Sequence, residues 1–324
     1  MKPLTVVITS FNRESFIGPS IESVLNNDFP DFELLVLDDA STDGTVEIAR
    51  RYARDERVRV EVNDRNLGQF ANRNRAIELV TTPFLKYHDS DDLMYPHCLE
   101  TMMRLLVEEP SAGFALSAGR AWSGGPCPML LTPRMAYERE YLGPGMFFGG
   151  PSAALFRTHI LRELGGFPER GVASDHCFWL KACAVTSVVL VPADLFWYRI
   201  HEGQELQSKP AARDYAIGHG ESWRALLAPE CPLEGAALER AKRNFMFLLM
   251  KLSWRDLRAG RWSLASLRLR SAGIGPRDLF RYAPRRKRDP LAGTPLTQDG
   301  EYVVPDWLHL QDNAMEEGRK RSRR

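Results

Sequence analysis

The sequence predicts an α/β fold built on a mostly parallel sheet with helices on its faces, and three observations lead to this prediction. In the N-terminal third, apolar segments with strand character alternate with segments of helical spacing, which is typical of parallel sheets with right-handed crossovers. Three of the strand-like segments run directly into polar residues, as strands do when their carboxyl ends form a ligand site. At 324 residues with 44% hydrophobic side chains, the chain can also bury a large core.

The order of the elements follows from apolar periodicity and turn residues. Leu4–Thr9 and Phe32–Leu37 are apolar runs, which indicate strands buried on both faces. Val58–Val62 alternates between apolar and polar residues, so we expect a more exposed strand there. The predicted elements are, in chain order, strand Leu4–Thr9, helix Ile17–Leu25, strand Phe32–Leu37, helix Val46–Tyr52, strand Val58–Val62, helix Ala71–Val80, strand Phe84–Asp89 and strand Gly113–Ala118.

The segment that ends the fourth strand carries three carboxylates, Asp89, Asp91 and Asp92, within four residues. Clustered carboxylates repel one another and are costly to bury without a counter-charge. Oxygen ligands at this density suit a hard divalent ion such as Mg²⁺ or Mn²⁺. Taken alone, the cluster is more simply a solvated acidic turn that caps the helix beginning near Pro96.

Two other polar groups favour the ligand site over the acidic turn. Thr9 ends the first strand and the pair Asp38–Asp39 ends the second, and the carboxyl ends of parallel strands meet at one edge of a sheet. No G-x-G-x-x-G follows the first strand and no G-x-x-x-x-G-K-[ST] occurs in the chain, which argues against a Rossmann dehydrogenase and a P-loop enzyme. A pyrophosphate bound at this edge would therefore have to be held by a metal.

Composition excludes several classes of protein. The net charge of +1 argues against a nucleic-acid partner, and five cysteines without a C-x-x-C pair argue against a disulfide framework or a zinc site. Without a signal peptide after Met1, or an apolar stretch near the ~20 residues that span a bilayer, we expect a cytoplasmic protein. The basic clusters Arg281–Arg288 and Arg319–Arg324 indicate either peripheral contact with the inner face of the membrane or solvated surface and tail.

Several of these segments together resemble a known family. Val6 to Leu99 is similar to the nucleotide-sugar-binding half of the family 2 glycosyltransferases, which have the GT-A fold. Individually each match is weak, but their order and spacing are specific; Ala76 stands where the family often has glycine. The matching segments are Val7–Arg13, Glu33–Thr45, Asn66–Gly68 with Arg73 and Asn74, and Asp89–Asp92 with Pro96.

The resemblance implies a nucleotide-diphosphate sugar as donor, with a UDP-sugar expected, and a Mn²⁺ or Mg²⁺ cofactor. Thr9 and Asp39 fall on positions that bind the base and ribose, and Asp91 falls on the metal-associated acidic motif. The sequence leaves open which of the three carboxylates contacts the ion. The residues expected to bind the donor are Thr9, Phe11, Arg13, Asp38, Asp39, Asn66, Gly68, Arg73, Asn74, Asp89 and Ser90, and those expected to hold the metal are Asp91, Asp92 and His201.

Other roles remain open for several of these residues. Asp38 is equally compatible with capping a turn, and Asn66–Gly68 is at least partly turn chemistry. Arg73 and Asn74 could lie on a helix surface. His201 belongs to Tyr198–His201, which resembles a Tyr-Arg-x-His element of the family near the diphosphate or metal, and imidazole is also a common metal ligand.

The acceptor side is expected around Ala173–Lys181. Asp175 falls on the position of the family's general base, although Ser174 replaces the glutamate that commonly precedes it. A carboxylate at a helix N-terminus is stabilised by the helix dipole, and general-base catalysis requires a positioned group of this kind. Capping of the following helix is the alternative for Asp175, and His176 is the second candidate base.

The resemblance therefore implies a metal-dependent inverting glycosyltransferase of surface glycan or glycoconjugate biosynthesis, with a glycan, lipid-linked or small-molecule acceptor. A sugar nucleotidyltransferase is disfavoured because no glycine-rich loop follows the first strand. A non-catalytic nucleotide-sugar-binding protein is the other alternative, and Ser174 is its only support.

Two regions are expected in the chain. Residues 1–205 are predicted to form the GT-A catalytic domain, with residues 1–100 as its nucleotide-sugar-binding half and residues 101–205 as its acceptor half. Residues 206–324 are predicted to form a helical C-terminal extension with a basic tail. Within the extension, the apolar and aromatic residues of Ala236–Arg258 and Trp262–Leu269 have helical spacing, and we expect them to be packing surface.

Overall fold

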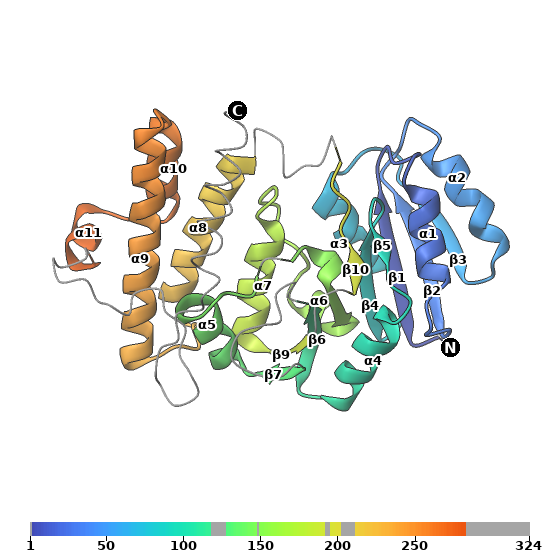
Figure 1. Cartoon of the computed structure of the whole chain (residues 1–324), viewed down its shortest axis with the longest axis horizontal. Coiled ribbons are helices and arrows are strands. Elements are labelled where there is room, and N and C mark those ends of the chain that lie inside the picture. Colours follow the sequence, from blue (N-terminus) through green and yellow to red (C-terminus); the bar gives the residue numbers. More distant parts are fainter. Residues whose placement is uncertain (1, 118–127, 148, 192–194, 202–210, 283–324) are drawn as a thin grey trace, which may run out of the picture.

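The structure is a computed structural model that describes residues 2–117, 128–147, 149–191, 195–201 and 211–282 (Figure 1). Within these ranges the strands form an eight-stranded sheet and a two-stranded sheet. The strands are β1 Leu4–Ser10, β2 Phe32–Asp38, β3 Val58–Val62, β4 Phe84–Asp89, β5 Leu93–Met94, β6 Ala112–Ser117, β7 Met129–Leu131, β8 Ala154–Arg157, β9 Ser187–Val191 and β10 Phe196–Trp197. The α-helices are α1 Ile17–Leu25, α2 Thr45–Arg51, α3 Gln69–Leu79, α4 Cys98–Glu108, α5 Pro133–Leu142, α6 Thr158–Glu163, α7 Ser174–Val185, α8 Ala211–Leu227, α9 Gly235–Arg258, α10 Trp262–Ser271 and α11 Pro276–Tyr282, and the 3₁₀-helices are η1 Tyr52–Arg54 and η2 Pro151–Ala153.

The first four strands form a parallel unit, as the alternation of strands and helices predicts. The large sheet has the order β3-β2-β1-β4-β8-β6-β9-β7, and β1 pairs in parallel with both β2 and β4. Strand β3 pairs with β2 and lies at the edge of the sheet. Its edge position explains the alternating pattern of Val58–Val62 and confirms that this strand is the more exposed one.

The second half of the sheet is joined through an antiparallel strand. Strand β8 lies between β4 and β6 and is antiparallel to both, whereas β6 and β9 are parallel. The predicted strand Gly113–Ala118 is present as β6, one residue earlier. The α/β fold class predicted from the sequence is therefore confirmed, with a mixed rather than purely parallel sheet.

Alternate residues of the strands are buried on opposite faces of the sheet, in two different apolar cores. Val6 and Ile8 of β1 contribute to a core with α1 and α4, whereas Val7 between them contributes to a core with α3 and α7. This second core continues without a break into the C-terminal helices, because Trp223 of α8 and Leu249 of α9 belong to it. The C-terminal helices are therefore packed on the same face of the sheet as α7.

Helices α8 to α11 form the end of the molecule opposite α2 (Figure 1). The amphipathic helix expected at Ala236–Arg258 is present as α9 and the following one as α10. The expectation that their aromatic residues are packing surface is wrong for Trp254 and Trp262, which are 63% and 69% exposed. Helical periodicity locates the apolar side of each helix, but the core does not cover the residues at the margins of that side.

None of the helices in the described ranges combines the length and the apolar character needed to cross a bilayer. Most of the basic cluster that begins at Arg281, and all of Arg319–Arg324, lie outside the described residues. The predicted domain boundary at residue 205 is not tested by the structure and stays a prediction.

Candidate active site

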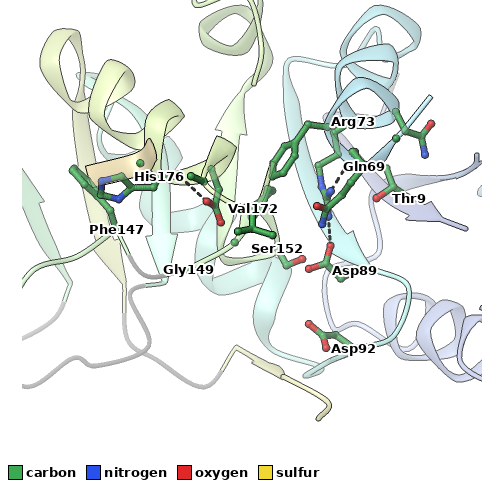
Figure 2. Close-up of a pocket in the computed structure, with 18 of the residues that line it drawn as sticks. Thr9, Gln69, Arg73, Asp89, Asp92, Phe147, Gly149, Ser152, Val172 and His176 are labelled. Carbon is green, nitrogen blue, oxygen red and sulfur yellow. Dashed lines mark hydrogen bonds and ion pairs between the residues drawn. The ribbon is translucent and has the colours of Figure 1, made fainter. Parts of the chain in front are cut away.

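A cavity of about 1420 Å³ lies at the carboxyl ends of β1, β2 and β4 and extends to the C-terminal helices. Figure 2 shows Thr9, Arg73 and Asp89 at one end of it, and Phe147 and His176 at the other. We call the first the donor end and the second the acceptor end. Among the predicted site residues, those that line the cavity are Thr9, Phe11, Arg13, Asp39, Asn66, Gly68, Arg73, Asp89, Ser90, Asp91, Asp92 and Asp175.

The strand register brings the donor-end residues together. In β1, Thr9 lies between Leu37 of β2 and Asp89 of β4. The next residue, Ser10, lies opposite Asp38, and its carbonyl accepts a hydrogen bond from the amide of Asp39 at 2.8 Å. The expected convergence of three polar strand ends is thus a direct result of parallel pairing.

Asp39 organises the loop that leads into α3. Its Oδ1 accepts hydrogen bonds from the amide of Leu67 at 2.8 Å and from Nδ2 of Asn63 at 2.7 Å, and its Oδ2 accepts one from the amide of Gly68 at 2.9 Å. Gly68 has a φ of +91°, a backbone conformation that residues with a side chain rarely adopt. The segment Asn66–Gly68 is therefore a turn built on Asp39, and both ends of this turn line the cavity.

Asp38 lies behind the cavity wall. Its carboxylate is fully buried and accepts hydrogen bonds from the hydroxyls of Ser10 and Ser41 at 2.8 and 2.6 Å, and from the amide of Ser41 at 2.7 Å. The intervening Ala40 has a φ of +63°. These bonds hold a strained turn, so the geometry of Asp38 corresponds to the turn-capping alternative.

A buried ion pair supports the floor of the donor end. Arg73 of α3, with a side chain only 3% exposed, pairs with Asp89 at the end of β4. Burial by itself would raise the pKa of Asp89, but the charge and hydrogen bond of Arg73, together with smaller contributions from neighbouring polar groups, hold that pKa below its usual range. Behind them, Lys86 is buried and donates to the carbonyl of Ser152, and burial lowers its pKa.

Asp91 and Asp92 have different surroundings. Asp91 Oδ2 lies 3.2 Å from Arg13 Nε and 3.1 Å from His201 Nε2. Asp92 is 1% exposed, and its Oδ1 accepts a hydrogen bond from the amide of Arg199 at 3.0 Å. Its Oδ2 is buried without a hydrogen-bond partner among the described residues. Burial, reinforced by the charge of Asp89, raises the pKa of Asp92 to about 8.

The environment of Asp92 suits a bound cation. A buried carboxylate oxygen without a donor is costly unless a positive charge is placed against it. No group of three or more His, Cys, Asp or Glu side chains among the described residues is arranged to hold an ion by itself. One or two carboxylates together with phosphate oxygens of a substrate are, however, the usual ligand set of Mg²⁺. Asp91 and Asp92 fit that incomplete kind of site.

Two other predicted site residues, Asn74 and His201, are not among the described residues that line the cavity. Both contact segments that do line it. The Asn74 side chain donates to the carbonyl of Phe167 and accepts from its amide, each at 2.8 Å, so it joins α3 to the loop before α7. His201 contacts Asp91, which does line the cavity. Its segment is fixed to the acidic loop by Arg199 Nε, which donates to the Asp91 carbonyl at 2.8 Å.

Asp175 lies in the first turn of α7 and faces the cavity. The N-cap position of this helix is occupied by Ala173, and no side chain forms a capping hydrogen bond there. Asp175 Oδ1 accepts a hydrogen bond from the neighbouring amide of His176 at 2.6 Å. Burial raises the pKa of Asp175 to about 6. Such a carboxyl group can take up a proton near neutral pH, which the capping alternative does not require.

Ser174, which replaces the glutamate of the family pattern, has a structural role. Its hydroxyl donates to the carbonyl of Gly171 at 2.7 Å and accepts from the amide of Arg170 at 2.9 Å, and the residue is fully buried. It therefore closes the turn that positions Asp175.

The acceptor end also contains residues that sequence reasoning did not find. The Ser222 hydroxyl of α8 donates to the carbonyl of Gly218 at 3.1 Å and lies 2.6 Å from His176 Nε2. Since its single proton is used, the hydroxyl accepts from His176 Nε2–H, which leaves Nδ1 as the acceptor of a neutral ring. The remaining lining residues from α8 and α9 are Tyr215, Gly218, His219, Phe245 and Leu248.

His219 is held from behind by a buried ion-pair network. Its Nδ1 lies 2.8 Å from Arg268 Nη1, and because arginine only donates, the proton of the neutral ring is on Nε2. Burial first, and then the nearby Arg268 charge, lowers the pKa of His219 to about 4. Arg268 in turn pairs with buried Asp256 at 2.7 Å. No motif marks these residues, because they belong to an ordinary helical pattern.

Comparison with solved structures identifies the fold. The structure of Staphylococcus aureus TarS residues 1–349 with UDP matches 76% of this chain and 71% of that chain, with a TM-score of 0.56 and 24% identity. The structure of the mannosyltransferase PcManGT from Pyrobaculum calidifontis with GDP-Man and Mn²⁺ matches 84% of this chain and 75% of that chain, with a TM-score of 0.55 and 19% identity. The fold is thus the GT-A fold of glycosyltransferases.

Sequence comparison gives the family. Residues 5–165 match the model of glycosyl transferase family 2, and this part of the chain belongs to that family. It is 36% identical to TuaG of Bacillus subtilis over 36% of this chain and 49% of TuaG. It is 26% identical to the poly(ribitol-phosphate) β-N-acetylglucosaminyltransferase TarS of Staphylococcus aureus over 64% of this chain, and 30% identical to the GalNAc(5)-diNAcBac-PP-undecaprenol β-1,3-glucosyltransferase of Campylobacter jejuni over 56% of it. The chain spans only 37% of that TarS and 60% of the Campylobacter relative.

Proposed function

We propose that this chain is a metal-dependent, inverting glycosyltransferase that moves a sugar from a nucleotide-diphosphate donor to an acceptor hydroxyl, in glycan or glycoconjugate biosynthesis. One observation carries the proposal. The carboxyl group of Asp175, with its pKa raised by burial, faces the same cavity as the polar ends of β1, β2 and β4. A base and a phosphate-binding edge in one cavity are what this reaction requires.

The donor end is suited to a nucleoside diphosphate. The turn built on Asp39 and the end of β1 at Thr9 offer polar atoms for the base and ribose, and Arg13 and Arg73 supply positive charge near the phosphates. Solved relatives of the same fold hold UDP, UDP-GlcNAc and GDP-Man. These observations support a nucleotide-sugar donor, and we propose a UDP-sugar.

Asp91 and Asp92 would hold a divalent ion together with phosphate oxygens of the donor, with His201 fixing the orientation of Asp91. The bound ion would neutralise the negative charge that develops on the leaving diphosphate. PcManGT, which has the same fold, was solved with Mn²⁺. Oδ2 of Asp92, which has no hydrogen-bond partner in the described part of the chain, is the observation on this chain that supports an ion.

Asp175 would act as the general base. The acceptor oxygen attacks the anomeric carbon of the donor sugar from the side opposite the phosphate, and its proton passes to Asp175. The bond from the anomeric carbon to the phosphate oxygen breaks, so the nucleoside diphosphate leaves with the bonding electrons. A single displacement of this kind inverts the anomeric configuration.

The acceptor end is suited to a hydroxyl-rich group. Phe147, Tyr215 and Phe245 provide aromatic faces of the kind on which apolar faces of sugar rings pack. His176 retains an acceptor nitrogen and His219 a donor nitrogen, which matches the donor and acceptor character of hydroxyl groups. We therefore propose a saccharide portion of the acceptor at this end.

The test is Asp175→Asn, assayed for nucleoside diphosphate release and for the anomeric configuration of the product. Loss of the base is expected to lower kcat/KM by about 10²–10⁴-fold, while calorimetry shows unchanged UDP affinity in the presence of Mn²⁺. Asp31→Asn, at an exposed position outside the cavity, is the matched control. Full activity of the Asp175 variant would exclude this residue as the base, and release of pyrophosphate instead of the nucleoside diphosphate would exclude glycosyl transfer.

A further inference from the structure

One face of α9 carries exposed aromatic and basic side chains along most of its length. Arg243, Phe247, Lys251, Trp254 and Arg258 are exposed, and their spacing of three or four residues places them on one face of the helix. The side chains of Phe247 and Trp254 are 46% and 63% exposed. We call this surface, together with Arg255, Arg261 and Trp262, the aromatic–basic face.

The aromatic–basic face continues into α10. Gly260 has a φ of +73° and allows the chain to turn sharply, and exposed Arg261 and Trp262 follow it directly. Trp262 is 69% exposed. The turn therefore adds another cation and a second indole next to the end of α9.

Acidic residues are scarce along this surface, with half-exposed Glu239 one turn before Arg243 at its start. Between Arg243 and Arg270 the sequence contains one acidic residue, Asp256. It is fully buried, and its carboxylate is occupied by Arg261 at 2.6 Å and Arg268 at 2.7 Å. The exposed cations of the stretch are therefore not interspersed with exposed carboxylates. Soluble surfaces usually mix both signs of charge.

Indole rings and cations side by side suit one environment in particular. Tryptophan concentrates at the interface between lipid headgroups and acyl chains, and lysine and arginine are attracted to anionic headgroups. An exposed helix face of this composition can bind in the plane of such an interface without crossing the bilayer. The absence of membrane-spanning helices among the described residues does not conflict with this mode.

We propose that the aromatic–basic face of α9 and the α9–α10 turn binds the surface of a membrane that contains anionic lipid. The turn lies at the end of the molecule toward which the parallel strands run (Figure 1), which is also the end that carries the cavity. Binding there would bring the cavity near the headgroups. The inference rests on surface charge and exposure alone and does not depend on the proposed reaction.

The experiment is co-sedimentation of the full chain with vesicles of phosphatidylglycerol and phosphatidylcholine, compared with vesicles of phosphatidylcholine alone. Wild-type protein is expected to bind the anionic vesicles, and binding should weaken with added salt. The double variant Lys251→Gln, Arg258→Gln should lower the partition coefficient about 30-fold, because each cation near an anionic surface contributes about fivefold. Arg50→Gln with Arg54→Gln, an equal loss of charge on exposed residues of α2 and η1 at the opposite end, should change it much less.

The indole rings are tested separately. Anionic vesicles are expected to shift tryptophan emission to shorter wavelength in the wild type, and Trp254→Ser with Trp262→Ser should abolish the shift and lower the bound fraction. Circular dichroism and turnover with a water-soluble acceptor should be unchanged in all these variants, which separates this proposal from the proposed function.

Three results would overturn the proposal. The first is equal binding to both kinds of vesicle or to neither, and the second is the same partition coefficient for the α9 variant and the α2 control. The third is a dimer in sedimentation velocity that the tryptophan variant dissociates while vesicles remain unbound, which would make the face a contact between two copies of this chain.

Discussion

The carboxyl groups at the donor end and at the acceptor end of the cavity have different electrostatic surroundings. At the donor end, Asp89 and Asp91 are paired with Arg73, Arg13 and His201. At the acceptor end, Asp175 is in no ion pair among the described residues, and its neighbour His176 bonds to a serine hydroxyl. Charge at the donor end prepares it for an anionic ligand. Burial at the acceptor end raises the pKa of Asp175, which suits the role of general base that we propose for it.

The largest expected effect concerns the support behind the acceptor end. Asp256→Asn would leave the buried guanidinium of Arg268 without its counter-ion, and we expect the free energy of unfolding to fall by about 3–5 kcal/mol. Urea denaturation followed by circular dichroism measures the loss. Glu221→Gln, which removes half-exposed surface pairs with Arg170 and Arg224, should cost less than about 1 kcal/mol. Equal effects of the two variants would show that the acceptor end is not braced by this buried pair.

The donor end should respond through ligand affinity instead. Arg13→Gln removes the guanidinium beside Asp91, and we expect UDP affinity to fall about ten- to hundredfold, as for the loss of a charged hydrogen bond. Isothermal calorimetry measures it, and the KM for the acceptor should be unchanged. Arg57→Gln breaks a similar pair with Asp55 away from the cavity and should leave UDP affinity unaltered. A change in acceptor KM alone would contradict the separation of the two ends.

The pH dependence tests the raised pKa of Asp175. A base must be ionised, so kcat/KM should be constant at neutral pH and fall about tenfold per pH unit below a pKa of about 6. Because the folded-state pKa lies above the ordinary value of 3.8, protonated Asp175 favours folding, and this contribution is lost as the pH rises from about 4 to 6. Asp175→Asn should remove that part of the stability profile. An acid limb near pH 4 would show that burial does not set the pKa of the base.

The smallest expected effect is at His219. His219→Phe removes the donor that Arg268 places on Nε2, and we expect the acceptor KM to rise about two- to tenfold, as for one neutral hydrogen bond. His219→Gln retains a donor and should restore most of the affinity. Steady-state kinetics with the donor saturated measures both, and identical values for the two variants would exclude a hydrogen bond from His219 to the acceptor.

The donor end could be predicted from the sequence because its geometry follows from a local rule. Once Leu4–Thr9, Phe32–Leu37 and Phe84–Asp89 are recognised as parallel strands, their last residues must share one edge of the sheet. Thr9, Asp39 and Asp89 do lie there. The directions of individual side chains needed the structure, since Asp38 turns inward to Ser10 and Ser41 and Asn74 bonds to Phe167.

The acceptor end could be predicted only where it contains a motif. Asp175 is predicted because it falls on the position of the family's general base, whereas no motif points to Ser222, His219 or Phe245. Their entry into the cavity depends on how α8 and α9 pack against α7, which no spacing within either helix specifies. The exposure of Trp254 cannot be predicted for the same reason, because periodicity shows that a helix has an apolar side but not how far the core extends to cover it.

The antiparallel contact between β4 and β8 has a consequence for synthesis of the chain on the ribosome. Residues up to Asp89 can already form the parallel unit β3-β2-β1-β4, but the outer edge of β4 is covered only when Ala154–Arg157 emerges some seventy residues later. Until then, the side of Phe84–Lys86 that faces away from β1 is an open strand edge, which can pair with other chains. Nascent chains cut short before β8 should therefore aggregate, whereas chains that extend past Arg157 should not.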